Sequence, residues 1–448
     1  MKRHAFFAAA LLIAGSLGIG NSVSARIGVS PLESQELSMS YSLMTSEFYK
    51  KSDPQTLLDG ARSELIAFLK KNGVDNPLVP QVRATDDVDR NSRELDRELA
   101  SVVGEYGQRF GSRPLTYAAI AGLVGSVKDR YTTFLTPKEF ADLNEGLDGG
   151  NFGGVGIAIR VDEQLKTLLV VDVIPDTPAE RAGIKQNDVI VTIDGKPTLG
   201  LKSEDDSKML RGKEGTVVRV TIERDGKLLP DPISITRAVI HQPSVYSRML
   251  DGGIGYARLT VFGANTASEL STALDKLEAQ GAKAYILDLR DNGGGYLNAA
   301  IDVSSKFIAT APIVSVESRG GNNTEYIGEN IAMAPKPLAV LVNHYTASAS
   351  EITSGAIQDN GVGQLIGERT FGKGVVQTIH PLPDGSAVKI TSARYLTPHG
   401  HDINTIGIQP DIVAQIQKGD KLGDPTSDTQ LKAALGYLRG KIASISGS

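Results

Sequence analysis

The chain has 448 residues, of which 40% are hydrophobic and 22% are charged, and its formal net charge is -5. This balance is typical of a globular protein with two or three domains, and it excludes the strongly basic surface of a nucleic-acid-binding protein. The chain contains no cysteine, which excludes disulfides, thiolate zinc sites and a lipoprotein anchor.

The N-terminus is typical of a secretory signal peptide. Lys2, Arg3 and His4 precede an apolar run from Ala5 to Ile19, and a small-residue site ends at Ala25. We therefore predict a signal peptide at residues 1–25 and export to the periplasm or cell envelope. The apolar run is shorter than the roughly 20 residues that span a bilayer, so an uncleaved N-terminal anchor is the second interpretation and secretion a third.

Residues 26–147 are predicted to form a helical N-terminal region. Asp53 and Pro54 provide an N-cap and a first helical position, and apolar residues then recur at helical spacing as far as Gly73. The charges from Arg83 to Arg97 predict a solvated linker. Further helices are expected from Leu115 to Val127 and after Thr136-Pro137. Packing or dimerisation is the simplest role for these helices, so a homo-oligomer is left open.

Residues 148–238 change to the alternating pattern of short strands. Strands are expected after Gly153, over Leu168–Val173 and over Val217–Glu223, with AGI, QND and IDG turns between them. This series resembles a PDZ domain. Such a domain captures a peptide carboxylate with loop N–H groups and pairs the peptide with a strand edge, here at Gly154, Val155, Gly156 and Ile157. The resemblance also implies that Arg211 couples peptide binding to an active site; a solvated loop charge is the alternative.

Residues 239–416 alternate strands with helices, which favours a mostly parallel sheet with helices on its faces. Gly293 to Gly295 is expected to open a helix at the end of a buried strand, so that backbone amides point outward there. Residues 417–448 are predicted to be a polar linker and an amphipathic helix, either a cap or a dimer element. The strands are predicted at Gly255–Leu259, Ala284–Leu289, Leu338–Val342, Gln364–Ile366, Val375–Ile379 and Ala387–Ala393.

The stretch from Asn343 to Gln377 is the strongest candidate for chemistry. A buried strand breaks at Asn343, and small residues then lead into a helix, so Ser348 lies near free N–H groups and the positive end of a helix dipole. Lys373 follows in an FGKG turn and can act as a base if burial lowers its pKa. If Val375–Ile379 is a strand, Gln377 shares a face with Lys373 and can orient its amine. Ser350 is an alternative nucleophile, and plain helix capping is the alternative for either serine.

These pieces resemble the C-terminal processing (tail-specific) peptidases, which are serine proteases with a Ser-Lys dyad. The matching segments are TASASE, FGKG, an upstream LDLRDNGGG, and DRYTTFLTP before the PDZ-like region; together they lie between about Leu115 and Val413. The resemblance implies a crotonase-like α/β core that the later part of residues 26–147 joins. It also implies that Ser348 is the nucleophile, Lys373 the base and Gln377 the orienting residue. Gly294 and Ala349 would be the oxyanion-hole amides.

Other constellations are weaker. His344 lies near Ser348 but no G-x-S-x-G elbow accompanies it, and His399, His401 and Asp402 lack a third histidine for a metal. Asp359 matches a family position linked to activity, although helix capping explains it equally well.

The sequence thus predicts an α/β protein with a crotonase-like protease core, an inserted PDZ domain and a helical N-terminal region. We expect an exported serine endopeptidase that recognises the free C-termini of unstructured proteins and needs neither a cofactor nor a metal. The alternative is a PDZ scaffold or adaptor on an inactive protease core. The expected partners are protein or peptide substrates and no nucleic acid, and a regulatory adaptor is left open.

Overall fold

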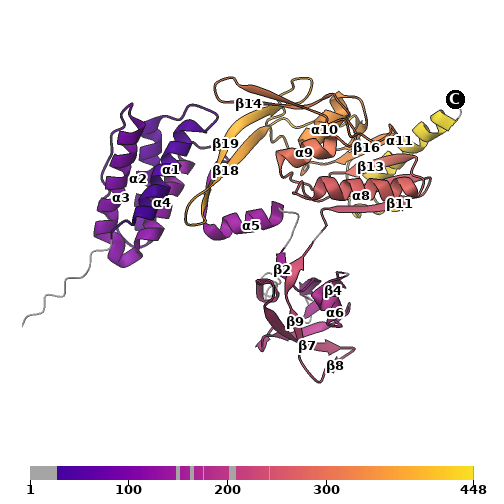
Figure 1. Ribbon diagram of the computed structural model, residues 1–448, viewed down its shortest axis with the longest axis horizontal. Coiled ribbons are helices and arrows are strands. Elements are labelled where there is room, and N and C mark those ends of the chain that lie inside the picture. Colours follow the sequence, from indigo (N-terminus) through magenta and orange to yellow (C-terminus); the bar gives the residue numbers. More distant parts are fainter. Residues whose placement is uncertain are drawn as a thin grey trace, which may run out of the picture.

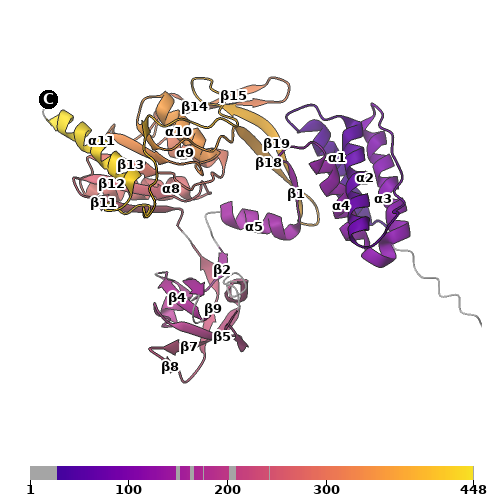
Figure 2. The same ribbon diagram turned by 180° about the vertical axis from the view of Figure 1, so that it is seen from behind.

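The computed structural model describes residues 28–147, 152–161, 166–174, 176–200, 208–241 and 243–446, so the predicted signal peptide lies outside the described residues. A helical bundle forms one end of the molecule and an α/β core forms the other, with a long strand pair between them (Figures 1 and 2). A smaller β-rich unit lies beside the middle of this row and is joined to it by α5.

Four helices form the N-terminal bundle: α1 (Pro31–Ser46), α2 (Pro54–Lys71), α3 (Val88–Phe110) and α4 (Ser112–Gly125). Three of them begin at a side chain that accepts a backbone N–H, namely Ser30, Asp53 and Asp87. Their apolar faces meet in one buried cluster. The predicted helix after Asp53-Pro54 is confirmed, because Asp53 accepts the N–H of Thr56 and α2 ends two residues before Gly73.

The predicted solvated linker at Arg83–Arg97 is wrong, because α3 begins at Val88 within it. The charged residues form the solvent-facing side of an amphipathic helix, whereas Leu95, Leu99 and Val102 on the other side are completely buried or nearly so. Charge density alone does not distinguish a linker from such a helix. The apolar residues at helical spacing identify the helix.

Glu98 of α3 faces the bundle interior and gives the bundle a predictable pH response. Its side chain is 2% exposed, and neither carboxylate oxygen has a hydrogen-bond partner among the described residues. Burial raises its pKa to about 7, against a smaller opposing effect of Arg62. Because the folded protein disfavours the charged form of Glu98, the free energy of unfolding is highest at acid pH and falls as the pH rises through 7. The total loss is about 3 kcal/mol.

We therefore expect Glu98→Gln to raise the melting temperature at pH 8 and to change it little at pH 5. Thermal unfolding at the two pH values measures this. Glu105→Gln, at an exposed position of the same helix, is the matched control and should leave both melting temperatures unchanged. A Glu98→Gln protein that melts lower than wild type at pH 8 would contradict a buried, unpaired carboxylate.

The small β-rich unit follows α5 (Pro137–Leu147) and has the strand pattern expected of a PDZ domain. Its sheet runs in the order β3 (Ile157–Val161), β4 (Leu168–Val173), β5 (Val189–Ile193), β7 (Val217–Arg224) and β8 (Lys227–Leu228). The strands β6 (Lys196–Pro197) and β9 (Ile233–Thr236) pair with β5 and β7, and α6 (Pro178–Arg181) covers one end. β2 (Phe152–Gly154) and β10 (Ala238–Ile240) pair where the chain enters and leaves the unit. Among the described strands, β3 pairs only with β4, so its outer edge is open.

The α/β core contains a six-stranded sheet. Its order is β11 (Val245–Leu250), β12 (Ile254–Leu259), β13 (Ala284–Asp288), β16 (Leu338–Val342), β17 (Gln364–Gly367) and β20 (Ile412–Val413), parallel throughout except between β11 and β12. α8 (Thr266–Ala279), α9 (Leu297–Ser304) and α10 (Ala349–Asp359) pack on one face, and α11 (Thr429–Ser446) packs on the other. The predicted parallel sheet is confirmed, and the C-terminal helix is a cap of this core. Buried Arg290 fixes that cap by pairing with Asp288 and Asp428.

A second, antiparallel sheet lies between the core and the bundle. It contains β1 (Thr133–Leu135), β14 (Pro312–Ser318), β15 (Asn323–Ile327), β18 (Val375–Pro381) and β19 (Ala387–Leu396). The sequence predicted β18 and β19 as further members of the parallel series, and β14 and β15 were not predicted. The far end of the β18–β19 hairpin enters the bundle, where Leu382, Val388 and Ile390 are buried and Tyr117 donates to Asp384.

Candidate active site

Ser348 lies in a strained turn between the buried strand β16 and helix α10. Its φ of 57° and ψ of -119° are unusual for a residue with a side chain and cost roughly 1–3 kcal/mol. The turn is held by its neighbours: the Thr346 hydroxyl donates to the Leu289 carbonyl, and the Ala347 N–H donates to the Asn292 carbonyl. The strain is therefore maintained by hydrogen bonds to the loop that follows β13, the adjacent strand. The side chain of Ser348 lies at the carboxyl edge of the parallel sheet.

Gly294 lies directly against this turn, as the resemblance implied. A Cβ atom at Gly294 would come within 2.8 Å of the Ala349 nitrogen, so only glycine leaves the space beside that N–H open. The Ala349 N–H makes no hydrogen bond among the described residues, because it is the first of α10. The Gly294 N–H, in contrast, donates to Asn292 Oδ1 at 2.9 Å. Of the two predicted oxyanion-hole donors, the Ala349 N–H is thus free among the described residues and the Gly294 N–H is hydrogen-bonded. The helix α9 begins at Leu297, two residues after the glycines that were expected to open it.

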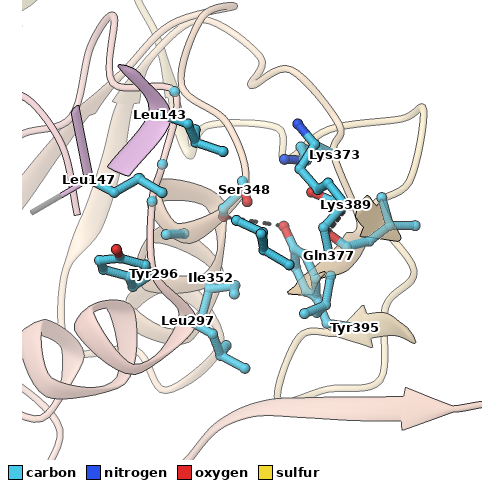
Figure 3. Close-up of a pocket in the computed structure, with 17 residues that line it drawn as sticks. Leu143, Leu147, Tyr296, Leu297, Ser348, Ile352, Lys373, Gln377, Lys389 and Tyr395 are labelled. Carbon is cyan, nitrogen blue, oxygen red and sulfur yellow. Dashed lines mark hydrogen bonds between the residues drawn. The ribbon is translucent and has the colours of Figure 1, made fainter. Parts of the chain in front are cut away.

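One cavity of about 300 Å³ brings the predicted catalytic residues together. Ser348, with Leu143 and Leu147 of α5 near it, faces Lys373, Gln377 and Lys389 across the pocket (Figure 3). Its lining comes from α5, from the glycine loop and the start of α9, from the Ser348 turn and the start of α10, and from β18 and β19 with the loop that precedes β18: Leu143, Leu147, Gly293, Gly294, Gly295, Tyr296, Leu297, Ser348, Ala349, Ile352, Lys373, Val375, Val376, Gln377, Ile379, Lys389 and Tyr395.

Lys373 has the electrostatic environment that a lysine base needs. Desolvation by burial and, to a smaller extent, the positive charge of Lys389 lower its pKa, Glu351 acts in the opposite direction, and the net pKa is about 8. The ammonium lies 5.0 Å from the centre of the Tyr131 ring and makes no ion pair or hydrogen bond among the described residues. A substantial fraction of Lys373 is therefore neutral slightly above neutral pH. The structure contains no hydrogen bond between its amine and the Ser348 hydroxyl in the described part of the chain.

Gln377 lines the pocket, but its amide does not orient Lys373 in this structure. Lys373, Val375 and Gln377 all line the pocket, as a shared face requires, and the register between β18 and β19 shifts after Val376 because Ser392 of β19 is an extra residue there. The amide nitrogen instead donates to the Val375 carbonyl at 3.3 Å. An orienting role for Gln377 would require this hydrogen bond to be exchanged, so that role stays a prediction.

Glu351 connects the two catalytic segments and was missed by the sequence analysis. Its buried carboxylate accepts the backbone N–H groups of Ser348 and Lys373, each at 2.9 Å, and that of Gly372 at 2.7 Å. The Thr370 hydroxyl donates to it as well, at 2.5 Å. Burial raises its pKa despite these hydrogen bonds. The signal was present in the sequence, because Ser348-Ala-Ser-Glu351 has the S-x-x-E spacing of a capping box.

The structure separates the remaining candidates from the pocket. Ser350 is completely buried and its hydroxyl donates to the Asn292 carbonyl at 3.0 Å, which favours Ser348. His344 is exposed and faces Glu368. Asp359 ends α10, at the opposite end from Ser348, and accepts the His399 N–H at 2.8 Å, which favours its structural interpretation. The described residues contain no group of three or more ligands for a metal near His401 or elsewhere.

A second cavity, of about 560 Å³, lies in the β-rich unit beside the open edge of β3. All of the predicted peptide-binding residues line it: Gly154, Val155, Gly156, Ile157 and Arg211. Gly156 has a φ of 88°, and a Cβ there would collide with Thr177. The loop thus packs closely against Thr177 at the start of α6 and leads directly into β3, beside the edge that a peptide could join.

Arg211 connects the two cavities. Its guanidinium lies over the Phe152 ring, 4.3 Å from the ring centre, and forms an ion pair with Glu145 of α5. Leu143 and Leu147 of the same helix line the cavity that contains Ser348. Arg211 of the β-rich unit is therefore paired with the helix that contributes two residues to the other cavity.

Comparisons with known proteins agree with these observations. Residues 253–414 match the model of peptidase family S41, and residues 169–224 match that of the PDZ domain. The carboxyl-terminal-processing protease of Picosynechococcus is 38% identical over 340 residues, covering 74% of this chain and 82% of the relative. The carboxy-terminal processing protease CtpA of Bacillus subtilis is 38% identical over 341 residues, covering 76% and 72%. A solved structure from Bacteroides fragilis assigned to the S41 proteases matches 90% of this chain with a TM-score of 0.51 at 17% identity, which shows the fold alone.

Proposed function

Because the chain belongs to peptidase family S41, and within it to the carboxyl-terminal processing serine proteases that carry a PDZ domain, we propose that it cleaves unstructured proteins held by their free C-termini. The cleavage uses Ser348 as nucleophile and Lys373 as base. The observation that carries this proposal is the pocket in which a strained serine faces a half-buried lysine whose ammonium has no ion pair among the described residues.

In the proposed mechanism the neutral amine of Lys373 removes the proton from the Ser348 hydroxyl as its oxygen attacks the substrate carbonyl. The tetrahedral oxyanion accepts a hydrogen bond from the free Ala349 N–H. The Gly294 N–H donates a second one after its hydrogen bond to Asn292 Oδ1 has broken. The Lys373 ammonium then protonates the leaving amine, and water hydrolyses the acyl-enzyme by the same steps in reverse. The serine and the lysine must first approach each other across the pocket.

We expect kcat/KM to rise with pH through about 8 and then to reach a plateau, because only neutral Lys373 can take the proton. Two pH units below that pKa, near pH 6, the rate should be about a hundredfold below the plateau. A pH-rate profile on a short peptide measures this. A profile that is already flat between pH 6 and 9 would contradict a lysine base.

Recognition of the substrate tail is assigned to the cavity beside β3. Its backbone N–H groups and Arg211 can bind a terminal carboxylate, while the open edge of β3 accepts the last residues of the peptide as an added strand. Engagement of Arg211 by that carboxylate competes with its ion pair to Glu145. Tail binding would in this way be transmitted to α5 and to the leucines that cover the catalytic pocket.

Amidation of the C-terminus of a long unfolded substrate is expected to reduce its cleavage by about tenfold, because it removes the charge that the loop amides and Arg211 bind. Cleavage rates of the free-acid and amidated forms measure the preference. Arg211→Ala should reduce the preference. Arg219→Ala, an exposed arginine on β7 outside this cavity, is the control and should preserve it. Equal cleavage of both forms by the wild type would refute tail recognition.

The scaffold or adaptor alternative predicts tail binding without cleavage. Incubation of an unfolded protein with wild type and with Ser348→Ala decides between the two: fragments with the wild type alone support the peptidase, and binding without fragments supports the scaffold.

Export is also part of the proposal and rests on residues 1–25 alone. N-terminal sequencing of the protein from fractionated cells tests it, since export with cleavage predicts a mature chain that begins at Arg26. Within the described residues, no helix has the length and apolar character needed to cross a membrane.

A further inference from the structure

A second lysine, Lys389, lies in the catalytic pocket and has no role in the mechanism above. It is carried by β19, where it pairs with Ile379 of β18, and both residues line the cavity. Figure 3 shows Lys389 on the same wall as Lys373 and Gln377, across the pocket from Ser348. The side chain is half-buried, so substrate that fills the cavity would cover it.

Lys389 is a cation without a counter-ion. Among the described residues its ammonium has no ion pair and no hydrogen bond, and burial lowers its pKa with no acidic group acting against this. Among the described residues, Lys373 and Lys389 are also the only charged ones in the lining of this cavity. The buried carboxylate of Glu351 already accepts hydrogen bonds from three backbone N–H groups and the Thr370 hydroxyl.

A half-buried ammonium that has lost part of its hydration is stabilised by a carboxylate that enters with the ligand. Lys373 cannot supply this function, because it must be neutral to act as the base. The two lysines of the pocket therefore differ in role: Lys373 must lose its proton to act as the base, and the charge of Lys389 lowers the pKa of Lys373.

We propose that Lys389 forms an anion subsite within the catalytic pocket, which binds a carboxylate of the substrate chain close to the scissile bond. This inference rests on the proposed peptidase function and is separate from the tail recognition assigned to the β3 cavity. Two sources supply the same chemistry: an Asp or Glu side chain near the scissile bond, or the α-carboxylate of a substrate cut only a few residues from its end. Basic side chains are disfavoured at the same position.

The test uses one quenched peptide in matched versions. For each position that flanks the cleaved bond, a peptide with Glu there is compared with the same peptide with Gln, and both have amidated C-termini. Separately, a peptide that ends a few residues after the cleaved bond is compared as the free acid and as the C-terminal amide. For each pair, the ratio of kcat/KM is measured with wild type, Lys389→Met, Lys389→Arg and the control Lys276→Met, an exposed lysine of α8. Ratios are used because loss of the Lys389 charge raises the pKa of Lys373 and slows every peptide near neutral pH.

We expect the wild type to prefer the carboxylate by about tenfold at one position or at the short free end, and the position identifies the source. Lys389→Met should bring that ratio to about one, while Lys389→Arg and Lys276→Met preserve it. The inference is overturned if the wild type shows no preference at any position, or if the preference survives in Lys389→Met.

A binding measurement separates this inference from the peptidase proposal. Labelled Glu and Gln peptides are titrated against Ser348→Ala and against Ser348→Ala with Lys389→Met. If the Glu peptide binds more tightly to Ser348→Ala and this preference disappears with Lys389→Met, the anion subsite is supported. Absence of cleavage by the wild type would then contradict only the peptidase proposal. Equal binding of both peptides to Ser348→Ala refutes the subsite whether or not cleavage occurs.

Discussion

Replacement of Ser348 by alanine is expected to lower kcat/KM by roughly four to six orders of magnitude, and Lys373→Ala should have a similar effect. The two residues act on the same proton, since Lys373 removes it from the Ser348 hydroxyl and returns it to the leaving amine. Their losses should therefore not add, and the double variant should be little slower than either single one. Cleavage of an unfolded protein, followed over hours at high enzyme concentration, measures the residual rates.

Ser350→Ala is the matched control for this experiment. Ser350 lies two residues away, but its hydroxyl is buried and donates to the Asn292 carbonyl, so its loss should cost stability and not chemistry. Circular dichroism and thermal melting confirm that each variant is folded. Substantial activity in Ser348→Ala, or full loss in Ser350→Ala with an intact fold, would move the nucleophile to Ser350.

The second large effect is expected from Glu351→Ala. Removal of this carboxylate leaves four buried donors without their acceptor, at the turn of Ser348 and in the loop of Lys373. We expect a loss of about 4 kcal/mol in the free energy of unfolding. Because both catalytic segments lose their common support, kcat/KM should fall by at least about a hundredfold even where the protein is folded.

Urea unfolding and peptide cleavage measure the two effects in parallel. Glu351→Gln retains one carbonyl oxygen as an acceptor and should lie between wild type and Glu351→Ala in both measurements. Glu325→Ala, at an exposed position of β15, controls for the loss of a glutamate. A Glu351→Ala protein with wild-type activity would show that the hydrogen bonds to Ser348 and Lys373 are not needed to position the dyad.

The sequence by itself determined the local features of this protein. A buried strand followed by small residues and a helix places Ser348 at a helix start, because apolar runs and N-terminal caps act over a few residues. The parallel core sheet follows from the same kind of pattern. The glycine loop was read directly from the sequence and the open strand edge was expected from the resemblance to a PDZ domain, and the structure has both.

Only the tertiary structure decided which of these pieces meet. Alternation is identical for strands of either sheet, so nothing in β18 and β19 indicated that they leave the parallel series and carry Lys389 into the pocket. Residue spacing could not show that the Gln377 amide donates to the Val375 carbonyl. The lowered pKa of Lys373 likewise depends on burial and on Lys389, and Glu98 is a charged residue whose burial depends on the other bundle helices. Desolvation and charge pairing depend on what surrounds a group in space, and residues far apart in the sequence supply those surroundings.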